Sequence, residues 1–161
     1  MSLQTSMQLS DIPNCHLDDT GIFKYIQIKV TSIQNPESSK IIIRGFEECE
    51  YHADIYDRVA PFLNGAGYQT NCLGGGRIKR SEGEIFVYGY SVGFGKGDHQ
   101  VACDVIKEFY GGDLYVHWSD EGYWSKIIFI FATNLFTCFK RISEKILWQE
   151  RKNLEKCQST E

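Results

Sequence analysis

The sequence predicts an α+β fold: a mixed β-sheet of about six strands packed with two main helices, followed by a C-terminal helical extension. Strand-like and helix-like patterns follow one another in the order strand, strand, helix, strand, strand, helix, strand. The chain has 161 residues, 42% of them hydrophobic and 24% charged, which suits one globular domain with a buried core. We expect this domain to be a monomer.

The first strand is predicted to begin at Gly21, because residues 1–20 are polar and irregular and are expected to form a flexible N-terminus. Alternate positions of "GIFKYIQIKVT" place apolar residues on one face of this strand, namely Ile22, Ile26, Ile28 and Val30. Lys24 falls on the same face. A charged residue there breaks the binary pattern, and the simplest explanation is that its stem packs while its ammonium reaches the rim.

A second strand is predicted at 40–46 ("KIIIRGF"), after the loop "NPESS", and a helix follows from about Glu50. The apolar stripe of this helix has helical spacing and comprises Tyr51, Ile55, Val59 and Phe62. Pro61 is expected to end or kink the helix, and Gly65 and Gly67 supply the exit from it.

The second half of the domain begins with two strands, at 69–80 and 84–91, which the turn signal "SEG" separates. A second helix is expected at 98–109, and the glycine pair at 111–112 stops it. Its inward-facing residues are expected to be Val101, Val105, Ile106 and Phe109. The short strand "DLYVHW" completes the domain.

The formal net charge of −4 is unevenly distributed, because residues 1–123 hold 10 Lys/Arg and 17 Asp/Glu whereas residues 124–161 hold 7 and 4. An acidic body argues against nucleic-acid binding, since affinity for the phosphate backbone needs clustered cations. Six cysteines without a CxxC pair, and a start without an apolar signal, indicate a reducing, cytoplasmic setting. The four histidines lack zinc-site spacing, so we expect no metal and no cofactor.

Two glycine-rich segments are candidate anion-binding elements. "VYGYSVGFGKGDH" (87–99) passes from a strand through a loop into a helix start, where backbone N–H groups converge. The alternative is a tight connection that needs glycine for φ > 0. "CLGGGRI" (72–78) either forms a bulge or lets Arg77 approach a ligand, and Arg44 is a further candidate anion contact. Neither segment has the GxxxxGK[ST] pattern of nucleotide-binding loops.

His52, in "EYHADIYD" near the start of the first helix, is the candidate catalytic base. Imidazole titrates near neutrality, and the positive end of a helix dipole favours its neutral form by about 0.3–1 kcal/mol. Glu50 and Asp54 oppose this effect, so the sequence leaves the direction of the net pKa shift open. A histidine that only closes a groove, without chemistry, is the alternative.

Several stretches together resemble the janus family, in particular its protein histidine phosphatases: "GIFKYIQIKV", "IIRGFEECEYHADIYD", "CLGGGRI", "VYGYSVGFG" and "WSDEGY". The resemblance covers residues 21–123 and keeps the order and spacing of the motifs, most specifically in "EYHADIYD" and "LGGGRI". It implies a compact sheet-and-helix domain at 21–123 that removes phosphate from phosphohistidine in proteins, without a metal.

The resemblance also implies roles for individual residues, with His52 corresponding to the family's proton acceptor. The residues implied in substrate binding are Lys24, Ser91, Val92, Gly93, Arg44 and Arg77. The phosphatases carry alanine at the position of Gly93, which keeps the backbone amide but makes this loop freer. A second hypothesis is a non-catalytic module that recognises phosphate or regulates, because janus relatives include proteins associated with sex-specific expression.

Residues 124–161 form a C-terminal extension that is expected to be helical. Its apolar stretch at 127–139 spans about 20 Å as a helix, less than the hydrocarbon layer of about 30 Å, so no transmembrane span is expected. Three alternatives are open: packing on the domain or a partner, contact with an anionic membrane surface, or a sequence translated beyond the natural stop.

Overall fold

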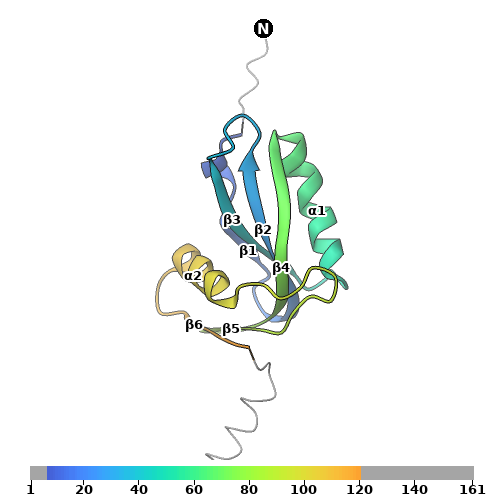
Figure 1. Cartoon of the computed structure of the whole chain (residues 1–161). Helices are drawn as coiled ribbons and strands as arrows, with labels where there is room; N and C mark the ends of the chain where they lie inside the picture. Colours follow the sequence, from blue (N-terminus) through green and yellow to red (C-terminus); the bar gives the residue numbers. More distant parts are fainter. Residues whose placement is uncertain (1–6, 121–161) are drawn as a thin grey trace, which may run out of the picture. The chain divides into compact units, whose positions relative to one another are not determined.

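The computed structural model describes residues 7–120, whose centre is one six-stranded mixed sheet (Figure 1). The two longest strands, β2 (Gly21–Ser32) and β4 (Tyr68–Ser81), are antiparallel neighbours in the middle of this sheet. β3 (Ser39–Phe46) pairs with the other side of β2, and β5 (Glu84–Tyr88) pairs with the other side of β4, both antiparallel. Residues far apart in the sequence therefore meet along β2 and β4.

Short parallel strands form both edges of the sheet. β1 (Cys15–Leu17) runs parallel to β3, and β6 (Tyr115–Ser119) runs parallel to β5. β1 lies in the segment that the sequence pattern left as a flexible N-terminus, so that expectation is wrong for these three residues. With only Cys15 and Leu17 facing inward, the strand is too short to show a periodic signal.

One helix covers each face of the sheet (Figure 1). α1 (His52–Gly65) packs Ile55 and Leu63 against one set of β2 and β3 side chains, comprising Ile26, Ile28, Val30 and Ile42. α2 (His99–Tyr110) packs on the opposite set, comprising Phe23, Tyr25, Ile43, Ile78, Ile85 and Val87. Successive residues of a strand point to opposite faces, so β2 serves both cores. The predicted α+β class, a mixed sheet of about six strands with two helices, is confirmed, although the sequence patterns located five of the strands and not β1.

The helices differ from their predicted stripes in detail. Pro61 does not end α1, which continues to Gly65, because Pro61 is exposed and water can hydrate the carbonyl that its ring leaves unpaired. Tyr51 and Phe62 were predicted to face inward, but they are 62% and 66% exposed, and Leu63 is buried instead. In α2 the predicted Phe109 is likewise exposed, while Ala102 and Cys103 are fully buried beside Ile106.

The glycines of "CLGGGRI" lie in β4, where they permit close packing on both sides. A Cβ at Gly75 would lie 2.3 Å from the carbonyl oxygen of Tyr25, and one at Gly76 would lie 2.5 Å from that of Tyr88. The register of β4 with β2 shifts between Gln27 and Ile28, which agrees with the bulge that was one of the two predicted alternatives for this segment. This irregular part of β4 lies next to the candidate site.

No helix among residues 7–120 is long and apolar enough to cross a membrane. The helix expected in the C-terminal extension, at 124–161, lies outside the described residues.

Candidate active site

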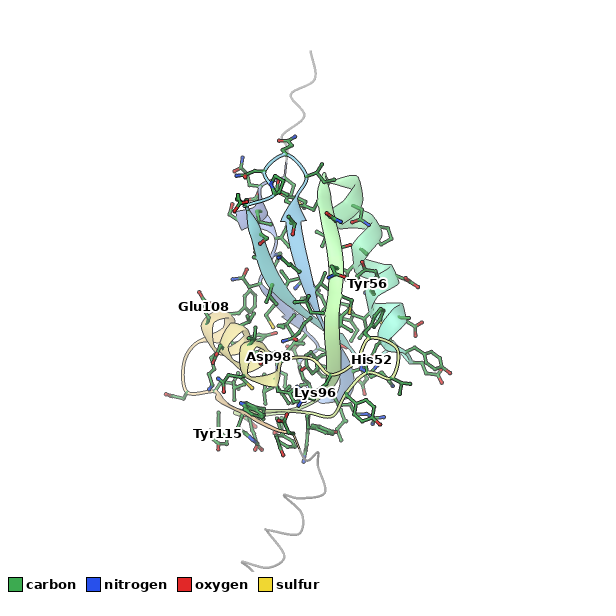
Figure 2. All side chains as sticks on the ribbon, viewed as in Figure 1. His52, Tyr56, Lys96, Asp98, Glu108 and Tyr115 are labelled. Carbon is green, nitrogen blue, oxygen red and sulfur yellow. The ribbon has the colours of Figure 1, made fainter. Side chains whose placement is uncertain are left out.

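The first turn of α1 holds His52 beside β4 (Figure 2). Tyr51 precedes the helix in an extended conformation, and its backbone N–H donates to the Asp54 carboxylate at 2.7 Å. This contact resembles one half of a capping box and fixes where the helix begins. The local sequence therefore places the imidazole one residue inside the helix start, facing β4.

The His52 ring is oriented by the backbone of β4. Its Nε2 lies 2.9 Å from the carbonyl oxygen of Gly76. A carbonyl only accepts hydrogen bonds, so Nε2 carries the hydrogen and donates it. In the neutral ring, Nδ1 is then left with a free electron pair. The missing side chain at Gly75 makes this approach feasible, because a Cβ there would lie 3.1 Å from His52 Cδ2.

Burial is the main influence on the His52 pKa and lowers it. The hydrogen bond to the Gly76 carbonyl opposes this shift, whereas the positive charges of Lys24 and Arg77 add to it. The net pKa lies below the ordinary histidine value of about 6.5, so His52 is mainly neutral at pH 7. This settles the direction that the sequence left open.

An open cavity of about 510 Å³ brings His52 together with Lys24, Arg77 and the 91–94 loop. Lys24 and Arg77 are direct cross-strand partners on β2 and β4. Lys24 is half-buried and Arg77 is exposed. The lysine that broke the strand pattern therefore lines an open cavity, where it and Arg77 place two positive charges near the neutral imidazole.

The 91–94 loop is held by its own backbone. Ser91 and Gly95 exchange two backbone hydrogen bonds of 3.1 and 2.9 Å, and the buried Ser91 hydroxyl accepts from the Phe94 N–H at 3.2 Å. Within residues 7–120, the N–H groups of Val92 and Gly93 have no hydrogen-bond partner. The loop thus presents unpaired donors at the cavity that contains His52, as an oxyanion cradle requires.

Arg44 does not share this cavity, contrary to the expectation from sequence. Its guanidinium is buried and donates to the carbonyl oxygens of Ile43 and Pro13, each at 2.8 Å. It lines a separate cavity of about 230 Å³ between the N-terminal segment and α1. The "RG" motif predicted an anion contact at Arg44. The position of Arg44 on β3 instead directs its guanidinium to the carbonyl oxygen of Pro13.

Sequence reasoning missed four other residues that line the cavity around His52: Tyr51, Ala53, Tyr90 and Phe94. Tyr51 and Tyr90 are 62% and 66% exposed and give the cavity aromatic walls. Each of the four residues is adjacent in sequence to a predicted site residue, and this adjacency is the signal that could have identified them. Tyr51 was instead assigned to the buried stripe of the helix.

The arrangement combines fixed donors and cations for an anion with a neutral nitrogen base. Such a site suits transfer of a phosphoryl group to water, where charge spreads over three oxygens and a nucleophile must be positioned. Among residues 7–120, no group of three His, Cys, Asp or Glu side chains is arranged to hold a metal ion. The fold and site define an α+β domain in which a histidine, two cationic side chains and a glycine-containing loop line one open cavity.

Comparison with known proteins identifies the family. The pattern of the Janus/Ocnus family matches residues 9–113, so this chain belongs to that family. The chain is 40% identical to the 14 kDa phosphohistidine phosphatase of Sus scrofa in an alignment of 127 positions that covers 75% of this chain and all of that protein. It is 40% identical to the protein of the same name in Homo sapiens, over 71% of this chain and 96% of that protein. It is also 42% identical to the sex-regulated protein janus-A of Drosophila pseudoobscura pseudoobscura, over 74% of this chain and 83% of that protein.

Proposed function

We propose that this chain is a protein phosphohistidine phosphatase that hydrolyses phosphohistidine in proteins without a metal. One observation carries the proposal: His52, with a free Nδ1 electron pair, lines the same cavity as Lys24 and the unpaired amides of Val92 and Gly93. The two relatives named as phosphohistidine phosphatases support the same activity.

In the proposed reaction, the phosphoryl oxygens lie against the 92–93 amides and the Lys24 ammonium. Arg77 stands at the rim and guides the anion into the cavity. These groups are fixed before substrate binds, so little reorganisation accompanies the spread of negative charge in the transition state. Ser91 contributes through its buried hydroxyl, which holds the turn that presents the amides.

His52 Nδ1 then accepts a proton from a water molecule as the oxygen of that water bonds to phosphorus. The N–P bond breaks, and its electron pair remains on the nitrogen of the substrate ring. When the other nitrogen of that ring carries a proton, the substrate side chain leaves as neutral imidazole. His52 finally returns its proton to solvent, and inorganic phosphate leaves.

A covalent route uses the same atoms in another order: Nδ1 of His52 attacks phosphorus, and water then releases the phosphoryl group. The two routes differ in whether His52 is ever phosphorylated. An alkaline quench during turnover, followed by intact-mass measurement, detects a phosphorylated enzyme only in the covalent route.

Phosphate release from a phosphohistidine peptide, with and without a chelator, tests the proposal. We expect release well above the spontaneous rate, unchanged by the chelator, and no release from the matching phosphoserine peptide. Loss of activity on chelation would contradict the metal-free chemistry. Release at only the spontaneous rate would favour a non-catalytic phosphate-recognition module, which the relatives named janus-A leave as the second candidate.

A further inference from the structure

A polar side chain lies in the core of the sheet, on the face that packs α2. Gln27 on β2 is 1% exposed, and its neighbour in this core is the fully buried Tyr25. A buried amide is destabilising unless both its donor and its acceptor are paired. The Gln27 Nε2 donates to the carbonyl oxygen of Asp98 at 2.6 Å, and the Asp98 N–H donates to Gln27 Oε1 at 2.7 Å.

Asp98, which is labelled in Figure 2, lies at the junction between the 91–97 loop and α2. The two hydrogen bonds connect Gln27 to this junction. Asp98 caps the helix, since its carboxylate accepts from the Val101 N–H at 3.1 Å. The preceding Gly97 packs closely against the Gln27 amide, because a Cβ there would lie 2.9 Å from Gln27 Oε1. The Gln27 amide therefore sets where the loop ends and where the helix begins.

Before this junction, two backbone hydrogen bonds attach the loop to Gly75 of β4. The Gly97 N–H donates to the Gly75 carbonyl at 3.0 Å, and the Gly75 N–H donates to the Gly95 carbonyl at 3.1 Å. The Gly95 carbonyl also accepts from the Ser91 N–H, which closes the turn that carries the phosphate-binding amides. The next residue of β4, Gly76, holds the His52 ring. The backbone groups of two adjacent residues of β4, Gly75 and Gly76, thus hold both halves of the site.

We propose that Gln27 is a positioning residue for the phosphatase reaction. Its hydrogen bonds to Asp98 hold the 91–97 loop in one register on β4, and this register determines the position of the loop amides relative to His52. Gln27 does not line the catalytic cavity, so it acts only through the loop. This inference rests on the proposed function for its catalytic consequence. Its structural part concerns the position of the loop and the affinity for phosphate, and both can be measured whether or not the chain is catalytically active.

The variant Gln27→Met tests the proposal in the full chain, since methionine keeps the approximate side-chain volume and removes both hydrogen bonds. We expect the Kd for inorganic phosphate to rise about tenfold or more, with a similar loss in kcat/KM, because small displacements of positioned groups have large effects. Hydrogen exchange at the Gly97 amide should accelerate by at least a similar factor. The His52 pKa should not move, because its contact with the Gly76 carbonyl remains.

Tyr25→Phe is the matched control. It removes another buried hydrogen bond from the same face, between Tyr25 Oη and His99 Nδ1 at 2.7 Å, and keeps both hydrogen bonds between Gln27 and Asp98. We expect it to lower the unfolding temperature while leaving phosphate affinity within about twofold of the parent. Gln27→Met and Tyr25→Phe values that agree within twofold, for phosphate Kd and for Gly97 exchange, would overturn the proposal.

Gly97→Ala tests the same contact from the other side and decides the matter if Gln27→Met does not fold. Its methyl group would displace the Gln27 amide or the loop, so phosphate affinity should fall although Gln27 is present. Unchanged phosphate affinity and unchanged exchange in this variant would also overturn the proposal. If the parent chain releases no phosphate, the proposed function fails, whereas the binding and exchange measurements still decide the role of Gln27.

Discussion

At the scale of single residues, the protonation state of His52 decides what the site can do. The helix dipole and the nearby carboxylates of "EYHADIYD" act in opposite directions, so no local pattern could settle the pKa of this histidine. Burial lowers this pKa, and the ring is packed beside Gly75 and Gly76 of β4, more than twenty residues along the chain. Long-range packing therefore supplies the property that the sequence motif alone leaves undetermined.

The first prediction concerns the pKa of His52. A lowered pKa means that the neutral base is present above that pKa and is lost as pH falls through it. We expect an NMR titration of the His52 ring to give a midpoint below the ordinary value of about 6.5, and the acid limb of kcat/KM to follow it. Lys24→Gln should raise that midpoint, because the Lys24 charge contributes to lowering it. A midpoint above 6.5 in the parent would contradict the neutral base.

The second prediction concerns the Lys24 ammonium as a contact for phosphate. Lys24→Ala should raise the Kd for inorganic phosphate about tenfold or more, since hydrogen bonds to charged groups contribute about 1.5–3 kcal/mol. Added salt should reduce this difference. Lys29→Ala is the control, because Lys29 is an exposed lysine of the opposite parity on the same strand. An equal Kd in Lys24→Ala and the parent, by calorimetry, would leave Lys24 with only the packing role.

At the scale of elements, the strong patterns predicted the right structure and the weak ones did not. Alternate positions of β2 from Ile26 to Val30 are apolar, which predicted a strand, and both helices were found from their periodicity. The helix faces were less certain, because apolar residues such as Phe62 also occur on exposed surfaces. Arg44 shows the same limit for the prediction of site residues. A motif contains the charged residue but does not show to which part of the fold its side chain is directed.

The third prediction concerns the glycine strand of β4. Gly75→Ala should lower the free energy of unfolding by at least about 2 kcal/mol, because overpacking is destabilising and a Cβ would lie 2.3 Å from the Tyr25 carbonyl oxygen. The same methyl group would displace the His52 ring. Urea unfolding followed by circular dichroism measures the effect. Gly65→Ala, where a Cβ meets no atom within 4 Å, should leave stability near that of the parent. Similar stabilities for the two variants would exclude the close approach at Gly75.

At the scale of the whole molecule, the cavity is a product of topology. Lys24, His52, Arg77 and the 91–94 loop come from four separate segments, and the register of β2 with β4 brings them together. The sequence contained the motifs in order, and a resemblance to a family supplied their expected roles. Periodicity and spacing alone could not show that these residues share one cavity, since no local rule fixes the pairing of distant strands. The two hydrogen bonds between Gln27 and Asp98 could not be predicted from the sequence for the same reason.

Inorganic phosphate release by the parent chain and by His52→Ala, in a single-turnover reaction with a phosphohistidine peptide, tests the central claim most directly. We expect the variant to fall to the spontaneous rate while it still folds and binds inorganic phosphate within about threefold of the parent, because the Lys24 and loop contacts remain. Release by the variant at the parent rate would show that His52 is not the base, and the catalytic account would be wrong.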